Sequence, residues 1–132
     1  ILPHITPNLS PDLAAPDFFP LASFLSSLAR VEDLPVKSVY PAHGQPFADL
    51  KGRVAEMRDH HRERSNLALQ ALAEKPKSGV MVSRFIFGNI RSPFDRLLAL
   101  NETYVHLLEL EREARITRQK QNGLCLFARI RA

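Results

Sequence analysis

The chain has 132 residues, of which 45% are hydrophobic and 24% charged, and its formal net charge is +4. This length allows one ordinary domain, or one small domain with a piece of another, and the composition excludes disorder throughout. A single cysteine excludes an internal disulfide and a cysteine-cluster metal site within one chain. The modest basic excess is compatible with nucleic-acid binding but does not require it.

No segment has the ~18 consecutive apolar residues that a membrane helix needs, and the N-terminus lacks the pattern of a secretion signal. We therefore expect no membrane association and a cytoplasmic protein. The first residue is Ile1, and the residues that follow it are typical of chain interior. We expect the chain to be a fragment.

The first third of the chain predicts a loop, a helix and a strand. Five prolines within residues 1–20 favour an extended or looped segment. Apolar residues at three- and four-residue spacing then predict an amphipathic helix over 21–34, ended by Pro35. Residues 36–40 are typical of a short buried strand, which leads into a loop that carries His43.

Three further helices are predicted in the middle of the chain. Asp49 is a suitable N-cap for a helix over 50–74. After a helix breaker at 75–79, residues 80–87 predict a short buried helix that ends at Gly88. Ser92 as N-cap and Pro93 at the first helical position start a long helix to about Glu113. Its apolar face is expected to contain Phe94, Leu97, Leu98, Val105, Leu108 and Leu110.

The C-terminal segment predicts a two-stranded hairpin. Residues 114–117 and 124–130 are candidate strands on either side of Gln121-Asn122-Gly123, and Asn-Gly is a strong hairpin signal. Helices followed by such a hairpin are typical of the winged-helix form of the helix-turn-helix.

The loop histidine is a candidate metal ligand. His43 follows the predicted strand and precedes Gly44, which allows a tight turn. A catalytic zinc ion needs about three protein ligands, and the neighbouring residues offer no second histidine or carboxylate at a recognised spacing. Judged from these residues alone, a loop histidine such as His43 is more often structural than a metal ligand.

Four sequence blocks add a family resemblance to this pattern. They are Ile1-Leu2-Pro3-His4-Ile5-Thr6-Pro7-Asn8, Phe24-Leu25-Ser26-Ser27-Leu28, Tyr40-Pro41-Ala42-His43-Gly44-Gln45-Pro46, and Arg53 through His60-His61-Arg62-Glu63-Arg64. In order and spacing the chain resembles metallo-β-lactamase-fold hydrolases, in the subgroup with a C-terminal winged-helix extension that includes a mitochondrial endoribonuclease. The likeness extends over nearly the whole chain.

The resemblance implies a mainly α chain: a remnant of the αβ/βα metallo-β-lactamase fold in residues 1–52, and a connecting helix with a winged-helix domain in residues 53–132. It implies one or two zinc ions in the parent protein. His43 matches the last histidine ligand of the family. The bridging aspartate and the histidine-rich block of the family have no counterpart here, so we expect the fragment to bind no zinc and to be inactive.

The resemblance therefore implies a zinc-dependent hydrolase as the parent protein, acting on an ester, thioester, lactone or phosphodiester. The alternative is a winged-helix nucleic-acid-binding module of a nuclease. The partner would accordingly be a small-molecule ester or thioester, or RNA. Candidate substrate or nucleic-acid contacts are the basic residues near the C-terminus, Arg112, Arg115, Arg118, Lys120 and Arg129. Apolar surface exposed in the fragment is expected to favour self-association.

The remaining histidines are expected to have structural roles. His60 and His61 are adjacent on one helix and point about 100° apart, which does not suit a shared metal ion. One of them is expected to pack or to donate a hydrogen bond, and Arg62 or Arg64 to pair with a carboxylate. His106 is expected to be partly buried and hydrogen-bonded.

Overall fold

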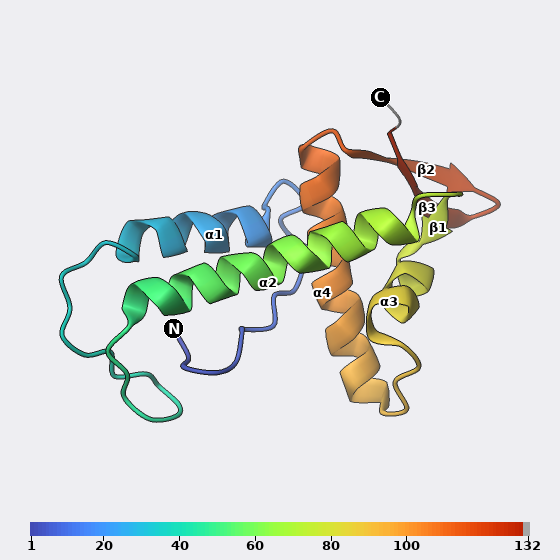
Figure 1. Ribbon diagram of the computed structural model, residues 1–132. Helices are drawn as coiled ribbons and strands as arrows, with labels where there is room; N and C mark the ends of the chain where they lie inside the picture. The colour runs from blue at the N-terminus through green and yellow to red at the C-terminus, as the bar shows by residue number, and fades with distance from the viewer. Residues whose placement is uncertain (131–132) are drawn as a thin grey trace.

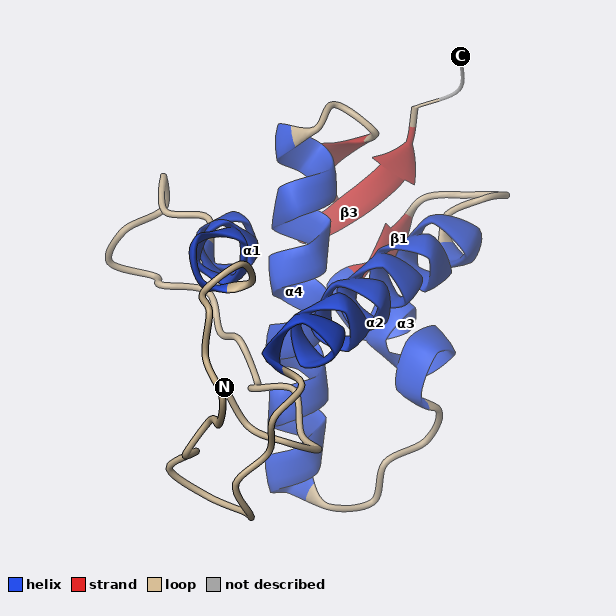
Figure 2. Cartoon of the chain, turned by 60° about the vertical axis from the view of Figure 1, so that its left-hand side comes forward, coloured by secondary structure: helices blue, strands red, loops and turns tan. Residues whose placement is uncertain are grey.

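A computed structural model describes residues 1–130 of the chain. The elements in chain order are α1 (Pro20–Val31), α2 (Leu50–Ala71), β1 (Lys77–Ser78), α3 (Gly79–Phe87), α4 (Pro93–Arg112), β2 (Ile116–Gln121) and β3 (Leu124–Arg129). In Figure 1, α4 crosses α2, α1 lies beside the first half of α2, and α3 and the strands gather near its other end. Figure 2 shows α2 and α4 between α1 and α3. The chain is mainly helical, as predicted.

Two helices start where their capping residues predicted. The Asp49 Oδ1 atom accepts a hydrogen bond from the Gly52 amide at 2.7 Å, which satisfies an amide that has no partner within α2. Ser92 caps α4 through the Asp95 amide at 3.3 Å, and Pro93 occupies the first helical position. These predictions are confirmed.

The first helix packs on α2 through a small apolar cluster. Leu28 lies against Leu50, Val54 and Met57, all nearly inaccessible to solvent. The helix ends at Val31, three residues before the predicted end at residue 34. Glu32 is its C-cap, and a turn in which the Leu34 amide donates to the Val31 carbonyl follows, so that Pro35 lies beyond the helix.

The main core joins the second half of α2 to α3, α4 and the sheet. Phe127 is fully buried, and its ring meets that of Tyr104 edge to face at a centroid distance of 5.9 Å. The buried residues of this core are Ala68, Leu69, Ala71, Leu72, Val82, Leu107, Leu110, Ile116 and Phe127. α2 therefore contributes to both clusters, one near each of its ends.

The predicted C-terminal hairpin forms, but its first strand is Ile116–Gln121 and not 114–117, because Ala114, at φ 55°, belongs to the turn after α4. β2 and β3 are antiparallel, with Gln121 opposite Leu124, so that Asn122 and Gly123 form a two-residue turn. Their φ angles are 49° and 76°. Positive φ at both central residues gives a turn whose twist matches the twist of the flanking strands.

The sheet has a third strand that the sequence analysis missed. β1 is antiparallel to β3, with Lys77 opposite Phe127 and Ser78 opposite Leu126, and the strand order is β1-β3-β2. The predicted break between the helices at 75–79 is present, but the prediction of a sheet with two strands was wrong, because β1 adds a third. Two residues are too few to display the alternation from which a strand is recognised.

The predicted strand over 36–40 does not form. A single antiparallel bridge joins Val39 to Phe47, and the flanking Val36 and Tyr40 are 41% and 81% exposed. A strand requires a neighbour with free backbone donors and acceptors, and within residues 1–130 the bridge to Phe47 is the strand-like pairing that this segment makes. The Val39 side chain packs instead on the apolar cluster of α1 and α2. The segment's apolar character alone did not produce pairing.

Several apolar side chains predicted to be buried are exposed. α3 buries only Val82 and Ser83, so the prediction of a buried helix over 80–87 was wrong. The predicted apolar face of α4 fails in its first turns, where Phe94 and Leu97 are 66% and 53% exposed. Figure 1 shows this end of α4 projecting past α2, so α2 does not cover its first turns. Within residues 1–130, no helix is both long and apolar enough to cross a membrane.

Candidate functional site

The loop that carries His43 is closed by backbone bonds and packed against the start of the chain. Val39 and Phe47 exchange two amide-to-carbonyl hydrogen bonds at 2.7 and 3.1 Å, and His43 is exposed on the loop between them. Gly44 has φ +92°, and a Cβ at this position would lie 2.7 Å from the Pro3 Cγ atom. Only glycine satisfies both the backbone conformation and this close approach.

The N-terminal segment is held beside this loop by Arg53. Its Nε atom donates to the Leu2 carbonyl at 2.8 Å, and its Nη1 atom donates to Glu56 at 2.8 Å. A cavity of about 430 Å³ opens between the segment and the loop, with His4 on one wall and Gln45 on the other. Two of the blocks identified in the sequence, 1–8 and 40–46, therefore meet in space.

The described residues do not supply a complete metal site. Within residues 1–130, no three His, Cys, Asp or Glu side chains come together to hold a metal ion. A zinc ion needs about three protein ligands, and one exposed imidazole provides one. The donor set of this chain, taken alone, does not fit the metal that the resemblance implies.

Three of the basic residues predicted to contact substrate or nucleic acid are paired with carboxylates. Arg112 donates to both Glu109 oxygens, at 2.9 and 2.6 Å, and this hydrogen bonding raises its pKa. Two other pairs have the same character: Arg115 with Glu113 at 3.3 Å, and Arg118 with Glu111 at 3.1 Å. Much of their positive charge is therefore compensated locally.

The other two predicted contacts lie on the hairpin. Lys120 on β2 and Arg129 on β3 are exposed, and neither forms an ion pair within residues 1–130. Because Ile116 pairs with Arg129 and Cys125 pairs with Lys120, the two cations lie toward opposite ends of the hairpin. The structure thus does not gather the five candidates into one site.

A buried histidine pair connects α2 to α4. The His61 Nδ1 atom lies 3.3 Å from the His106 Nε2 atom, and the Ser65 hydroxyl lies 3.0 Å from the His106 Nδ1 atom. His61 and His106 are 2% and 1% exposed. The prediction that one of the paired histidines has a packing role is in accord with this geometry, and His106 is more deeply buried than expected.

Burial changes the acid–base behaviour of this pair. It lowers the pKa of His61 to about 4, with smaller contributions from the charges of His60 and Arg64. It lowers the pKa of His106 to about 3, with the same neighbours and His61 adding to the effect. Removing a cationic imidazole from water is unfavourable, so both rings are neutral near pH 7.

A half-buried carboxylate flanks the histidine pair. Glu102 on α4 lies 3.4 Å from His60 and 3.4 Å from Arg64, both on α2. The Arg64 guanidinium also lies over the Phe87 ring, 4.5 Å from its centroid. Arg62 pairs with Asp59 at 2.7 Å. The expectation that an arginine of this block meets a carboxylate therefore agrees with the structure.

The proximity of His61, His106 and Ser65 was not predicted from the sequence. His61 and His106 are 45 positions apart on separate helices, so no spacing rule joins them. A usable signal was present for Ser65, because it lies four residues after His61 and so shares its helix face.

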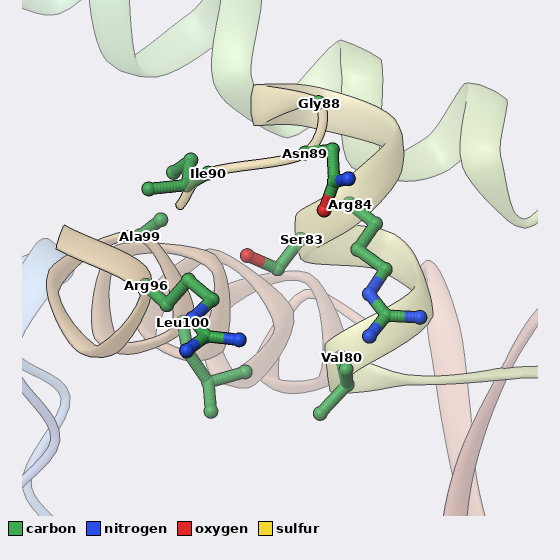
Figure 3. A pocket seen from close by; sticks show the side chains of 9 residues that line it. All are labelled: Val80, Ser83, Arg84, Gly88, Asn89, Ile90, Arg96, Ala99 and Leu100. Atoms are coloured by element: carbon green, nitrogen blue, oxygen red, sulfur yellow. The ribbon is translucent and has the colours of Figure 1, made fainter. Parts of the chain in front are cut away.

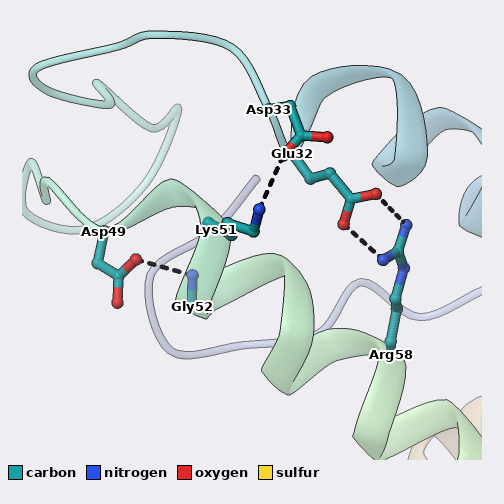
Figure 4. A network of polar contacts seen from close by, with 6 residues as sticks. All are labelled: Glu32, Asp33, Asp49, Lys51, Gly52 and Arg58. Atoms are coloured by element: carbon teal, nitrogen blue, oxygen red, sulfur yellow. Dashed lines mark hydrogen bonds and ion pairs between the residues drawn. The ribbon is translucent and has the colours of Figure 1, made fainter.

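Polar contacts fix α1 and the loop before α2 against the start of α2. Figure 4 shows Arg58 beside the Glu32 carboxylate and Lys51 beside Asp33. Arg58 donates two hydrogen bonds to Glu32, of 2.5 and 2.9 Å, and Lys51 donates one to Asp33, of 2.9 Å. The Arg58 pair is bidentate and partly shielded, whereas the Lys51 pair is exposed. The Arg58 contact therefore adds to the apolar packing that joins the end of α1 to α2.

Comparisons with known proteins find metallo-hydrolases among the relatives of this chain. No protein-family model matches it. The probable metallo-hydrolase YqjP of Bacillus subtilis (strain 168) is 29% identical over 108 residues, which are 82% of this chain and 34% of the relative.

Two crystal structures resemble nearly the whole chain. A β-lactamase domain protein from Burkholderia ambifaria superposes with a TM-score of 0.86 and 32% identity, over 93% of this chain and 37% of that protein. A metallo-β-lactamase family protein from Thermus thermophilus gives a TM-score of 0.80 and 30% identity, over 98% of this chain and 39% of that protein. The chain thus has metallo-β-lactamase-fold homologues and spans about a third to two fifths of their length.

Proposed function

We propose that this chain is part of a zinc-dependent hydrolase of the metallo-β-lactamase type, in which His43 is one metal ligand. The observation that carries the proposal is the packing of Gly44 on Pro3, which holds the His43 loop beside the N-terminal segment. Homology to metallo-hydrolases over 82% or more of the chain supports it. The proposed substrates are an ester, thioester, lactone or phosphodiester.

The arrangement of residues 1–8 and 40–46 suits this role. A loop closed at its base by the Val39–Phe47 bridge presents the imidazole on a fixed backbone. Metal ligands need such orientation by surrounding contacts. We propose that the remaining ligands lie outside this chain, because its own donors are too few.

The helices and sheet support a second structural proposal. α2, α3 and α4 are followed by the β2–β3 hairpin, and β1 adds a third strand. This is the order of elements in a winged helix. We propose that residues 53–132 are a winged-helix domain, although α2 itself begins at Leu50.

The metal proposal is tested by His43→Ala in the protein that carries the complete site. Loss of a ligand should lower zinc content, measured by inductively coupled plasma mass spectrometry, and should lower hydrolysis of a panel of esters, thioesters, lactones and phosphodiesters in parallel. The matched control is Gln45→Ala, an exposed non-ligand of the same loop, which should retain both. Unchanged zinc content and hydrolysis in His43→Ala would refute the assignment.

The same proposal predicts the behaviour of the 132-residue chain. Zinc titrated into it should bind weakly, and hydrolysis of the panel should not exceed the background, because one imidazole is too few ligands. Tight zinc binding that survives His43→Ala would show that other residues form the site.

A further inference from the structure

A small pocket lies between α3 and α4, away from the His43 loop. Its volume is about 170 Å³, and Figure 3 shows the side chains that surround it. The walls come from α3, from the connection after it and from the first half of α4. The lining residues are Val80, Ser83, Arg84, Gly88, Asn89, Ile90, Arg96, Ala99 and Leu100.

The pocket is strongly cationic. Arg84 of α3 and Arg96 of α4 contribute guanidinium groups from its two sides, and no carboxylate is among the lining residues. Neither arginine forms an ion pair within residues 1–130, in contrast to Arg58 and Arg112. Both arginines are exposed at the mouth of the pocket, so an anion entering it meets two guanidinium groups that no carboxylate of the lining compensates.

Neutral hydrogen-bond donors add to this charge. Figure 3 shows the Ser83 hydroxyl between the two arginine side chains, and Ser83 is only 8% exposed. The Asn89 amide lies on the same rim. Its position follows from Gly88, which ends α3 at φ +73° while its amide donates to the Arg84 carbonyl at 2.9 Å. The backbone thus turns so that Asn89 borders the cavity.

The rest of the wall is apolar. Val80, Ile90, Ala99 and Leu100 form a surface against which an apolar or planar group can pack. An apolar wall with a few polar groups is the character of small-molecule sites, but at about 170 Å³ this pocket is smaller than most of them and can hold only one end of a ligand.

We propose that this pocket binds a phosphate monoester carried on a small planar or apolar group, of the kind found in a nucleotide. Guanidinium groups bind phosphate through paired, charge-assisted hydrogen bonds. A phosphate has three peripheral oxygens in a tetrahedral array, so it can accept from Arg84, Arg96 and Ser83 together. A carboxylate has two oxygens in one plane and matches donors on several sides less well.

The proposal does not depend on the metal. It concerns residues of α3 and α4 that play no part in the proposed coordination by His43, and it can be tested on the 132-residue chain without zinc. The phosphate could belong to a free nucleotide or to the end of a nucleic-acid strand. The experiment distinguishes these two sources.

The test is calorimetric titration of the chain with phenyl phosphate, adenosine monophosphate, and single-stranded RNA with or without a terminal phosphate. We expect saturable, salt-sensitive binding of the phosphate monoesters. Arg84→Gln and Arg96→Gln should each weaken it by roughly tenfold or more, as expected for a charged hydrogen bond. The matched control, Arg30→Gln, removes an exposed arginine of α1 and should leave it unchanged.

The outcomes are distinct. Binding of adenosine monophosphate as tight as that of phosphorylated RNA supports a free nucleotide, and preference for phosphorylated RNA supports a strand end. Absence of saturable binding by every monoester overturns the proposal, as does binding that survives both arginine substitutions or that falls equally in Arg30→Gln. Circular dichroism establishes whether each variant is folded. If a glutamine variant is unfolded, the corresponding Arg84→Lys or Arg96→Lys variant, which retains the charge, replaces it.

Discussion

The buried histidine pair makes stability depend on pH. The pKa of His61 is lowered to about 4 and that of His106 to about 3, whereas an unfolded imidazole titrates near ~6.5. The unfolded chain therefore binds protons before the folded chain does, and the free energy of unfolding should fall as the pH decreases from about 6.5 to about 4. The decrease from these two groups should level off below about pH 3. Urea unfolding at a series of pH values measures it.

Carboxylates also destabilise proteins in acid, so a variant is needed to isolate the histidines. His106→Gln keeps an amide that can meet Ser65 and removes one titrating group. Its unfolding free energy should fall less steeply between about pH 6.5 and about pH 4, by up to ~1.4 kcal/mol per pH unit, the contribution of one proton. Identical slopes in the variant and the parent chain would show that His106 is not the source.

At the scale of single elements, α4 offers a test of its capping residue. The Ser92 hydroxyl accepts from the Asp95 amide, so Ser92→Ala leaves that amide without its partner. We expect the free energy of unfolding to fall by about 1 kcal/mol, measured by urea denaturation. Ser26→Ala in α1 replaces an exposed serine within a helix and serves as the control, with an expected change within about 0.5 kcal/mol. Equal effects of the two substitutions would argue against the cap.

The elements that the sequence predicted well are those defined by local signals. Asp49, Ser92 and the Asn122-Gly123 turn each act on residues a few positions away, and each marks its element in the structure. The segment over 36–40 and β1 depend instead on distant partners. Among the described residues, the segment over 36–40 has no distant strand to pair with, whereas β1 pairs with β3, about 50 positions later in the chain. Pairing of this kind is decided by tertiary structure, which apolar content does not reveal.

The candidate sites follow the same division. His43 stays a predicted ligand that rests on a motif confined to one loop, whereas the Gly44–Pro3 contact and the His61–His106 pair join segments about 40 or more positions apart. The Arg112–Glu109 pair lies within one helical turn and was open to prediction from spacing. Attention to charge partners along the helix would have weakened the nucleic-acid interpretation of that arginine.

At the scale of the whole molecule, exposed apolar side chains in the loop after α1 indicate self-association. Leu34, Val36 and Tyr40, on the segment around the Val39–Phe47 bridge, are 51%, 41% and 81% exposed. Burying such apolar surface stabilises contact between copies by ~25 cal/mol per Å². We expect sedimentation velocity of the 132-residue chain to show a species larger than the monomer, growing with protein concentration.

Substitutions at different exposed apolar positions distinguish self-association through this loop from non-specific association. Val36→Ser with Tyr40→Ser removes apolar surface from the loop, and Phe94→Ser removes a comparable exposed group from the projecting end of α4. If the loop is the contact, the double substitution should restore the monomer while Phe94→Ser should not. Val36 and Tyr40 lie outside the helices and the sheet and have exposed side chains, so the variants should keep the helical spectrum of the parent chain. The loop is not the contact surface if the chain stays monomeric at every concentration, or if Phe94→Ser alone abolishes association.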